Sequence, residues 1–275
     1  MDAVSRTVMF ISDGTGITAE TLGKGLLSQF EGVEFNYERY PFTDSLEKAD
    51  ACLQHVASIG NAPRPLLIMT MMDDKIAARL RRADALVLDL FEAFISPLEH
   101  ELGRRATHQV GRTHGQDSRE YARRIAAMNF SMAHDDGISA ADLKNADVIL
   151  VGVSRSGKTP TSLYLSLHFG LKAANYPLIP EDFERDCLPD SLRPFSDKLF
   201  GLTISPEQLH RIREERRPNS RYASLENCRY EVAAAERLMR RSGITWFDMT
   251  SRSIEEMAVH LLQAIHKKRP SAIDS

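Results

Sequence analysis

The sequence predicts an α/β fold, with an amino-terminal α/β domain on a mainly parallel sheet and a second, kinase-like α/β domain around a phosphate-binding loop (P-loop). Short apolar runs alternate with amphipathic segments along the first half, which is the pattern of parallel strands joined by helices. In the second half, an apolar run leads directly into a glycine-rich loop and a helical segment. We therefore expect domains over residues 1–140 and 141–275, with the junction between Gly137 and Asp147.

The first half is expected to alternate strands with helices. The strands fall on apolar runs rich in β-branched and aromatic residues, at 7–12, 33–40, 65–71 and 85–90. The helices fall on the segments between them, at 17–30, 44–59 and 73–82. An Asp or Ser cap opens the second of these helices.

A polar and basic segment at 98–116 is predicted to be a loop. The helix that follows has apolar residues at helical spacing, at Tyr121, Ile125, Met128 and Met132. It is expected to end before His134, where the chain becomes polar.

The second half is expected to continue the alternation. Strands are predicted at 147–151, 198–204 and 244–249, and helical segments at 162–171, from 206 onward, at 222–242 and at 254–266. Ser205 is the expected cap of the basic helix that begins at Pro206. The polar tail at 267–275 is expected to fray, and no internal repeat is visible.

Composition excludes several classes of protein. The chain has 275 residues, of which 43% are hydrophobic, and a net charge of −3, so it lacks the basic field of a nucleic-acid binder. Cys52, Cys187 and Cys228 show no C-x-x-C spacing and are expected to be small buried residues rather than zinc ligands or disulfides. No segment approaches the roughly 20 apolar residues of a membrane span, and the first residues lack a secretory signal. We expect a cytoplasmic protein.

The most specific feature is a complete phosphate-binding motif, G-x-x-x-x-G-K-[ST]. Its residues are Gly152, Val153, Ser154, Arg155, Ser156, Gly157, Lys158 and Thr159. It lies between an apolar run and a helical segment, the context that this motif requires. Glycines let the backbone N–H groups point inward, Lys158 can reach terminal phosphates, and Thr159 offers a hydroxyl to Mg²⁺. The alternative is a glycine turn that only joins a strand to a helix.

A second glycine turn follows the first predicted strand. It contains Asp13 and Thr15, at a strand end where open α/β sheets collect ligands. It lacks a lysine and a full dinucleotide fingerprint. The turn is therefore either a second site for a phosphorylated group or partner, or a tight turn with an Asp cap.

Basic residues crowd the stretch 210–222. Arg213, Arg216, Arg217 and Arg221 could close over transferring phosphates as a lid. Because Glu214 and Glu215 are interleaved with them, a solvated helix with salt bridges is the alternative.

Two polar clusters lie outside the predicted elements. One contains Arg112 and His114, and the other His134, Asp135 and Asp136. A histidine beside carboxylates suits proton transfer, and an aspartate can accept a hydroxyl proton or bind Mg²⁺. Polar loops with helix caps explain both clusters equally well.

Eight ordered blocks resemble the family of phosphoenolpyruvate synthase and pyruvate, phosphate dikinase regulatory proteins. They are ISDGTGITAETLG, RTHG, AHDDGIS, VILVGVSRSGKTPTSLYL, AANYPLIPED, KLFGLTI, IREERRPNSRYASL and SIEEMA. The resemblance runs from about Val8 to about Leu262. The blocks, including Gly157 where the dikinase branch has a serine, favour the synthase branch.

The resemblance implies a bifunctional enzyme. Members phosphorylate a threonine of their target with ADP as donor, and reverse this with inorganic phosphate, releasing pyrophosphate. ADP would bind at 152–159, and phosphoenolpyruvate synthase would be the protein partner. Lys158 would then clamp the donor phosphates, Thr159 would hold Mg²⁺, and Asp135 or Asp136 is the hypothetical base. The oligomeric state stays open, with a homodimer as one alternative.

Other functions fit the same residues. A P-loop kinase of a small metabolite or nucleotide would use the same loop, and the same protein kinase could act on pyruvate, phosphate dikinase instead. A nucleotide-dependent binding switch without transfer chemistry is a third alternative. The separate amino-terminal half favours a protein modifier, which needs a surface on which to dock its target.

Overall fold

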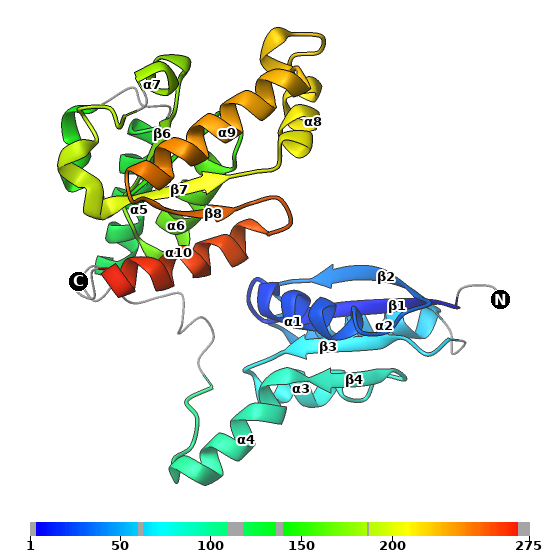
Figure 1. Cartoon of the computed structure of the whole chain (residues 1–275). Coiled ribbons are helices and arrows are strands. Elements are labelled where there is room, and N and C mark those ends of the chain that lie inside the picture. The colour runs from blue at the N-terminus through cyan, green and yellow to red at the C-terminus, as the bar shows by residue number, and fades with distance from the viewer. Residues whose placement is uncertain (1–3, 60–62, 109–117, 136–139, 186, 269–275) are drawn as a thin grey trace. The chain divides into compact units, whose positions relative to one another are not determined.

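The chain forms two compact units, Met1–Gln116 and Asp117–Ser275. Figure 1 shows the computed structural model, which describes residues 4–59, 63–108, 118–135, 140–185 and 187–268. Each unit contains a four-stranded sheet in which every strand pair is parallel. The predicted α/β class is therefore confirmed.

The first unit has the strand order β2-β1-β3-β4. Its strands are β1 (Val4–Ser12), β2 (Val33–Tyr40), β3 (Leu66–Thr70) and β4 (Leu86–Asp89). Its helices are α1 (Ile17–Leu27), α2 (Leu46–Ile59), α3 (Asp74–Leu80) and α4 (Leu90–Leu102).

Alternate residues of β1 and β3 pack on opposite faces of this sheet, as strand geometry requires. Met9 and Ile11 pack with α2 and α3, whereas Val8 and Phe10 pack with α1 and Leu90. Buried apolar residues on both faces of the two inner strands explain why their sequences read as almost continuous apolar runs.

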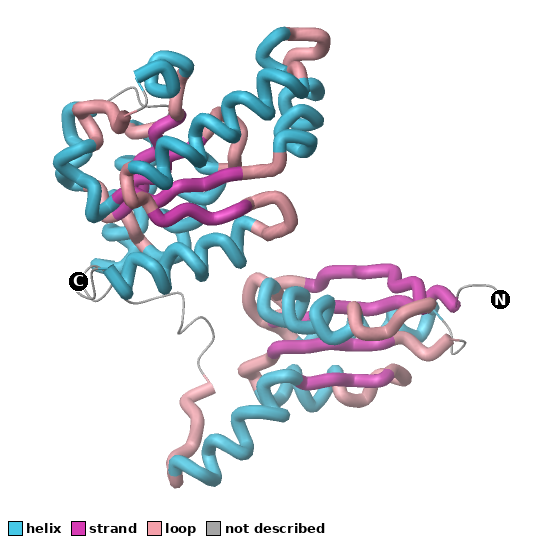
Figure 2. The backbone as a smooth tube through the Cα atoms, viewed as in Figure 1, coloured by secondary structure: helices cyan, strands magenta, loops and turns pink. Residues whose placement is uncertain are grey.

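The second unit has the strand order β6-β5-β7-β8, and Figure 2 draws its strands in magenta. Its strands are β5 (Val148–Gly152), β6 (Ala173–Pro177), β7 (Leu199–Thr203) and β8 (Thr245–Asp248). Its α-helices are α5 (Ser118–Ala133), α6 (Lys158–Phe169), α7 (Pro180–Arg185), α8 (Pro206–Arg216), α9 (Leu225–Arg241) and α10 (Ile254–Lys268). Three 3₁₀ segments complete the described part of this unit, at Ala140–Asn145, Arg193–Lys198 and Arg221–Ala223.

The two faces of the second sheet are also both covered. Ile149 and Val151 of β5 pack with α7 and α9, and Val148 and Leu150 pack with α6 and α10. The predicted cap of α8 is confirmed, since the Ser205 hydroxyl accepts a hydrogen bond from the backbone N–H of Gln208 at 3.3 Å. These layers fix the strand ends that carry the candidate site.

Both sheets share one topology, although no sequence repeat is visible. In each, the first strand is central, the second pairs on one side, and the third and fourth follow on the other. The helix after each first strand begins behind a glycine in the left-handed conformation, Gly16 at φ 79° and Gly157 at φ 87°. The two units therefore repeat the same arrangement of strands and helix starts, although their sequences show no repeat.

Several described elements differ from the prediction, among them α4, β6 and the short helix α7, which was not predicted. The loop predicted from residue 98 begins inside α4, which continues past Pro97 to Gly103, a left-handed glycine that ends the helix. The strand β6 was not predicted. Its sequence, Ala-Ala-Asn-Tyr-Pro, has little β-propensity, and a proline is tolerated there because β6 is an edge strand.

The boundary between the units also differs from the predicted junction near residue 140. Helix α5, which the prediction places in the first domain, packs on α6 and β6 of the second. The Ser131 and Ser166 hydroxyls lie 2.6 Å apart, and Ser131 Oγ accepts a hydrogen bond from the Ala173 N–H. These buried contacts explain why the second unit begins at Asp117.

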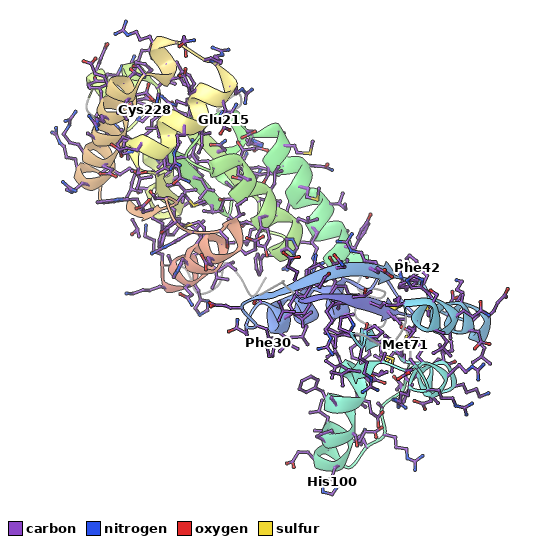
Figure 3. All side chains as sticks on the ribbon, turned by 90° about the vertical axis from the view of Figure 1, so that its right-hand side faces the viewer. Phe30, Phe42, Met71, His100, Glu215 and Cys228 are labelled. Atoms are coloured by element: carbon purple, nitrogen blue, oxygen red, sulfur yellow. The ribbon has the colours of Figure 1, made fainter. Side chains whose placement is uncertain are left out.

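The prediction that the cysteines are buried is confirmed for Cys52 and Cys228 but not for Cys187. Cys52 and Cys228 are buried, Cys187 is half-buried, and all three are free thiols. Figure 3 labels Cys228, which lies on α9. Burial raises the pKa of the Cys52 and Cys228 thiols, so these two residues act as small apolar side chains.

Candidate functional site

The P-loop joins β5 to α6 in the second unit. β5 ends at Gly152 and α6 begins at Lys158, so the loop lies at the carboxyl end of an inner strand. The strands β6 and β7 pair with β5 on opposite sides. In open α/β sheets, ligands bind where the connections diverge in this way.

Two glycines allow the loop to take its path. A Cβ atom at Gly152 would lie 2.2 Å from the carbonyl oxygen of Leu202 in β7, so only glycine permits this approach. Gly157 has a φ of 87°, which glycine adopts without strain, and it precedes α6 without a side-chain cap. The N–H groups of the first turn of α6 therefore point out of the helix toward the loop.

Lys158 is buried at the loop. The residue is 4% exposed, and its Nζ donates a hydrogen bond to the carbonyl oxygen of Val153 at 2.7 Å. The ammonium group is thus held against the loop backbone, where a phosphate would place its oxygens.

Ser156 carries a buried hydroxyl that is suited to binding a ligand. The residue is 0% exposed, lines the cavity beside the loop, and its Oγ has no hydrogen-bond partner among the described residues. A buried hydroxyl without a partner costs free energy, so such a group in a binding loop is suited to a ligand oxygen.

The cavity beside the loop has a volume of about 710 Å³. Three arginines from separate segments line it: Arg155 from the loop, Arg216 from α8, and Arg252 from the segment before α10. Converging positive charge of this kind suits a polyphosphate. Arg155 and Arg216 were predicted from the motif and the basic stretch, whereas Arg252 was not predicted.

Three polar side chains meet at one side of the cavity. The Thr159 hydroxyl donates to Oδ1 of Asp135 at 2.9 Å, and Nδ2 of Asn175 donates to the Thr159 oxygen at 2.9 Å and also to Asp135. Asn175 is 3% exposed, and its Oδ1 has no hydrogen-bond partner among the described residues. The fold thus brings Asp135 to the P-loop threonine, and Asn175 joins them from β6.

The remaining members of the acidic cluster are placed differently. The His134 ring stacks on Phe130 at 3.9 Å between centroids, and its Nδ1 donates to the Phe130 carbonyl oxygen at 2.8 Å. His134 does not line the cavity in the described part of the chain, so its predicted catalytic role has no support from the geometry. Asp136 lies outside the described residues.

The arginines of the predicted lid also separate. Arg213 is 0% exposed and pairs with Glu231 at 2.6 Å, so the lid prediction is wrong for this residue: it already lies inside the fold. Arg216 lines the cavity, whereas Arg217 and Arg221 are exposed residues away from its lining. For these three, closure over a ligand stays a prediction.

The predicted second site lies in the first unit. Asp13 is largely buried, and its carboxylate accepts a hydrogen bond from the Met72 backbone N–H, so it ties two loops at the carboxyl edge of the sheet. Thr15 is exposed. Arg112 and His114 lie outside the described residues. The role of this turn in ligand binding stays a prediction.

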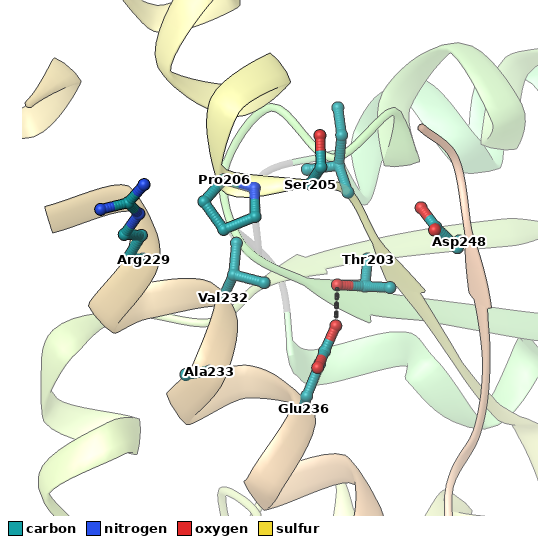
Figure 4. A pocket seen from close by; sticks show the side chains of 9 residues that line it. Thr203, Ser205, Pro206, Arg229, Val232, Ala233, Glu236 and Asp248 are labelled. Atoms are coloured by element: carbon teal, nitrogen blue, oxygen red, sulfur yellow. Dashed lines mark hydrogen bonds between the residues drawn. The ribbon is translucent and has the colours of Figure 1, made fainter. Parts of the chain in front are cut away.

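A second cavity, of about 300 Å³, lies at the carboxyl ends of β7 and β8 (Figure 4). Its polar groups are paired within the protein: the Thr203 hydroxyl donates to Glu236 at 2.8 Å, and Asp248 accepts from the backbone N–H of Thr250 at 2.8 Å. This pairing distinguishes it from the P-loop cavity, where Ser156 Oγ and Asn175 Oδ1 have no hydrogen-bond partner among the described residues.

The described helices are all too short or too polar to cross a bilayer. No group of three or more His, Cys, Asp or Glu side chains that could hold a metal occurs within the described residues. A metal at the P-loop would therefore depend on hydroxyl, amide or phosphate oxygens in addition to Asp135.

Comparison with known proteins gives a consistent assignment. A family model described as kinase/pyrophosphorylase matches residues 8–262. A protein of Aromatoleum aromaticum is 59% identical over 273 residues, covering 98% of this chain and 99% of its own length. A protein of Azoarcus sp. is 59% identical over 269 residues, covering 96% and 97%, and one of Burkholderia multivorans is 54% identical over 268 residues, covering 96% and 98%.

All three of these relatives carry the name "Putative phosphoenolpyruvate synthase regulatory protein". The match extends over both units, so it does not depend on the P-loop, which unrelated proteins share. The chain therefore belongs to the kinase/pyrophosphorylase family of phosphotransferase-type enzymes.

Proposed function

We propose that this protein is an ADP-dependent serine/threonine kinase and a phosphate-dependent pyrophosphorylase, and that its protein substrate is phosphoenolpyruvate synthase. The single observation that supports a phosphotransfer site most strongly is the P-loop cavity with its buried Lys158 and the Ser156 hydroxyl, which has no hydrogen-bond partner among the described residues. The names of the relatives and the family description support the target and the two activities.

The nucleotide is expected to bind at residues 152–159. The backbone N–H groups of the loop and of the first turn of α6 would bind phosphate oxygens, with Lys158 on the terminal phosphate. The arginines that line the cavity add positive charge around the same group. A volume of about 710 Å³ is in the usual range for a ligand of nucleotide size.

The residues beside Thr159 fit a magnesium ion. Thr159 would hold the ion, with the carboxylate of Asp135 and the Oδ1 of Asn175, which is unpaired within the part of the chain that the structure describes, as further oxygen groups next to it. When bound, Mg²⁺ would offset the negative charge of the phosphates. The protein's own groups would orient the donor and the acceptor.

In the kinase direction, the oxygen of the target threonine would form a bond to the β-phosphorus of ADP. The bond from that phosphorus to the bridging oxygen would break, AMP would leave, and Asp135 is the candidate to take the hydroxyl proton. In the other direction, an oxygen of inorganic phosphate would attack the phosphothreonine, giving pyrophosphate and a threonine oxygen that regains a proton. Phosphate is already negatively charged, so this attack needs no strong base.

The test is phosphate transfer from β-labelled ADP to purified phosphoenolpyruvate synthase. Pyruvate, phosphate dikinase and γ-labelled ATP serve as parallel controls. We expect label on the synthase and a loss of at least about 100-fold in Lys158→Ala, because the lysine stabilises the transferring group. Lys144→Ala, at an exposed residue of the same unit, should retain the activity.

Each of the other results would change a different part of the proposal. Label on the dikinase alone would change the target but keep the chemistry. No label on either protein, with ADP binding intact, would favour a kinase of small metabolites. Full activity of Lys158→Ala would contradict the role of the P-loop.

A further inference from the structure

The P-loop is held from its buried side by two residues that do not line the cavity in the described part of the chain. The carbonyl oxygen of Ser154 accepts a hydrogen bond from Nη2 of Arg213 at 3.0 Å. The hydroxyl of the same serine lies 3.0 Å from the hydroxyl of Tyr222, within hydrogen-bond distance. The backbone of this loop residue is therefore bound by Arg213 of α8, and its side chain by Tyr222 of the segment between α8 and α9.

Arg213 is oriented by contacts of both terminal nitrogens and of its guanidinium face. Its Nη2 also donates to Glu231 at 2.6 Å, its Nη1 donates to the Tyr222 carbonyl oxygen at 3.0 Å, and its guanidinium lies 4.1 Å from the centre of the Tyr222 ring. It is among the largest fully buried side chains, yet its Nε has no hydrogen-bond partner in the described residues. Burying an incompletely paired charge does not favour stability, so its position requires another explanation.

The bond to Ser154 determines how the next peptide group is directed. In a planar trans peptide, the carbonyl of Ser154 and the N–H of Arg155 point in opposite directions. With the carbonyl held by Arg213 on the buried side, the N–H is directed away from Arg213. Arg155 has a φ of 75°, a left-handed conformation that is disfavoured for arginine. Arg213 and Tyr222 thus hold a peptide that would otherwise relax.

We infer that Arg213 and Tyr222 are positioning residues that fix the peptide between Ser154 and Arg155 in its anion-binding orientation and so set the affinity for the nucleotide. This inference rests on the proposed function, because it assigns the anion to the phosphates of ADP. It gives the arginine-rich segment a role from behind the loop, in addition to any lid formed by its exposed arginines.

The test compares ADP binding by Tyr222→Phe and by the wild type, measured by calorimetry on the full chain. The substitution removes one hydroxyl and keeps the ring under Arg213, so folding should be retained. We expect ADP affinity to fall about 5-fold, the effect of one ordinary hydrogen bond, with kcat at saturating ADP unchanged. Tyr230→Phe, at an exposed residue of α9, is the matched control and should bind like the wild type.

A second comparison separates positioning from packing. Glycine adopts a positive φ without strain. Arg155→Gly therefore keeps the backbone conformation but removes the strain against which Tyr222 and Arg213 have to hold it. In the Arg155→Gly background, Tyr222→Phe should therefore weaken ADP binding less than about 2-fold. Arg213→Lys keeps the charge but loses the planar fork, and should raise the Kd for ADP more than Tyr222→Phe does.

The outcomes are distinct. Wild-type affinity in Tyr222→Phe, or the same loss with and without Arg155→Gly, would overturn the inference while leaving the proposed function intact. If the wild type bound neither ADP nor pyrophosphate, the proposed function would fail, and this inference with it.

Discussion

Asp135 fits two chemical roles in the proposed reactions, and kinetic measurements can distinguish them. Its carboxylate reaches the P-loop through Thr159, at 2.9 Å, from the end of a helix that lies before the loop in sequence. This contact suits either a base for the threonine hydroxyl or an oxygen group beside Mg²⁺. The two roles affect the two reactions differently.

Asp135→Asn keeps the shape of the side chain and removes its basicity. If Asp135 is the base, the kinase rate should fall about 100-fold, whereas the pyrophosphate-forming rate should fall less than about 10-fold, because phosphate arrives already charged. Both rates are measured on the same preparation at saturating substrates. Asp190→Asn, whose side chain is 90% exposed, is the matched control.

Equal and mild losses in both directions would contradict the role of Asp135 as base. Equal and severe losses, reversed in part by raised Mg²⁺, would favour the magnesium role instead. The same measurement on Asp136→Asn tests the neighbouring carboxylate, which is adjacent to Asp135 in the same acidic pair.

At the scale of elements, the close approach of β5 and β7 limits what the loop can tolerate. A Cβ at residue 152 would lie 2.2 Å from a backbone oxygen, which cannot move aside as a flexible side chain can. Gly152→Ala should therefore lower the free energy of unfolding by about 1–3 kcal/mol.

Denaturant unfolding measures this loss, and Gly25→Ala provides the matched control. Gly25 lies in α1 with nothing within 4 Å of its would-be Cβ, so alanine there should add about 0.5–1 kcal/mol through helix propensity. Equal effects of the two substitutions would show that the contact between β5 and β7 is not restrictive.

The elements that could be predicted are those with a local signal. The P-loop strand and helix follow from an apolar run, two glycines and a lysine, and the cap of α8 follows from a serine before a proline. Strand β6 gave no such signal, since its residues gain their strand conformation from pairing with β5. Asn175 could not be recognised for the same reason: it reaches Asp135 across 40 residues of sequence.

Tyr222 and Arg213 illustrate a further limit. The sequence showed a cluster of arginines, and charge patterning treats such residues alike. The fold distinguishes them, because one turns inward to Glu231 and the loop while its neighbours remain exposed. Sequence composition alone therefore does not distinguish an arginine that is buried and paired inside the fold from an arginine that is exposed at the surface.

At the scale of the whole molecule, the candidate nucleotide site belongs to one unit. The described residues that line the P-loop cavity run from Asp135 to Ile254, all within Asp117–Ser275. A fragment of residues 117–275 should therefore bind ADP with a Kd within about 3-fold of the full chain.

A fragment that begins at residue 141, the boundary expected from sequence, is the informative comparison. It lacks α5, and with it Asp135 and the buried Ser131 hydroxyl that bonds to Ser166 and Ala173. We expect this fragment to unfold at lower denaturant concentration and to bind ADP poorly. Equal stability and binding of the two fragments would show that α5 is dispensable.

The order of the strands in each sheet has a consequence for synthesis on the ribosome. Each unit is a continuous stretch of chain, so the first can complete its sheet before the second emerges. In the second unit, the inner strand β5 emerges early. Strand β8, which pairs with the free side of β7, emerges about 40 residues after β7. Until then the edge of β7 is open to pairing with other chains. The nascent protein is therefore most exposed to misassembly just before its last strand leaves the ribosome.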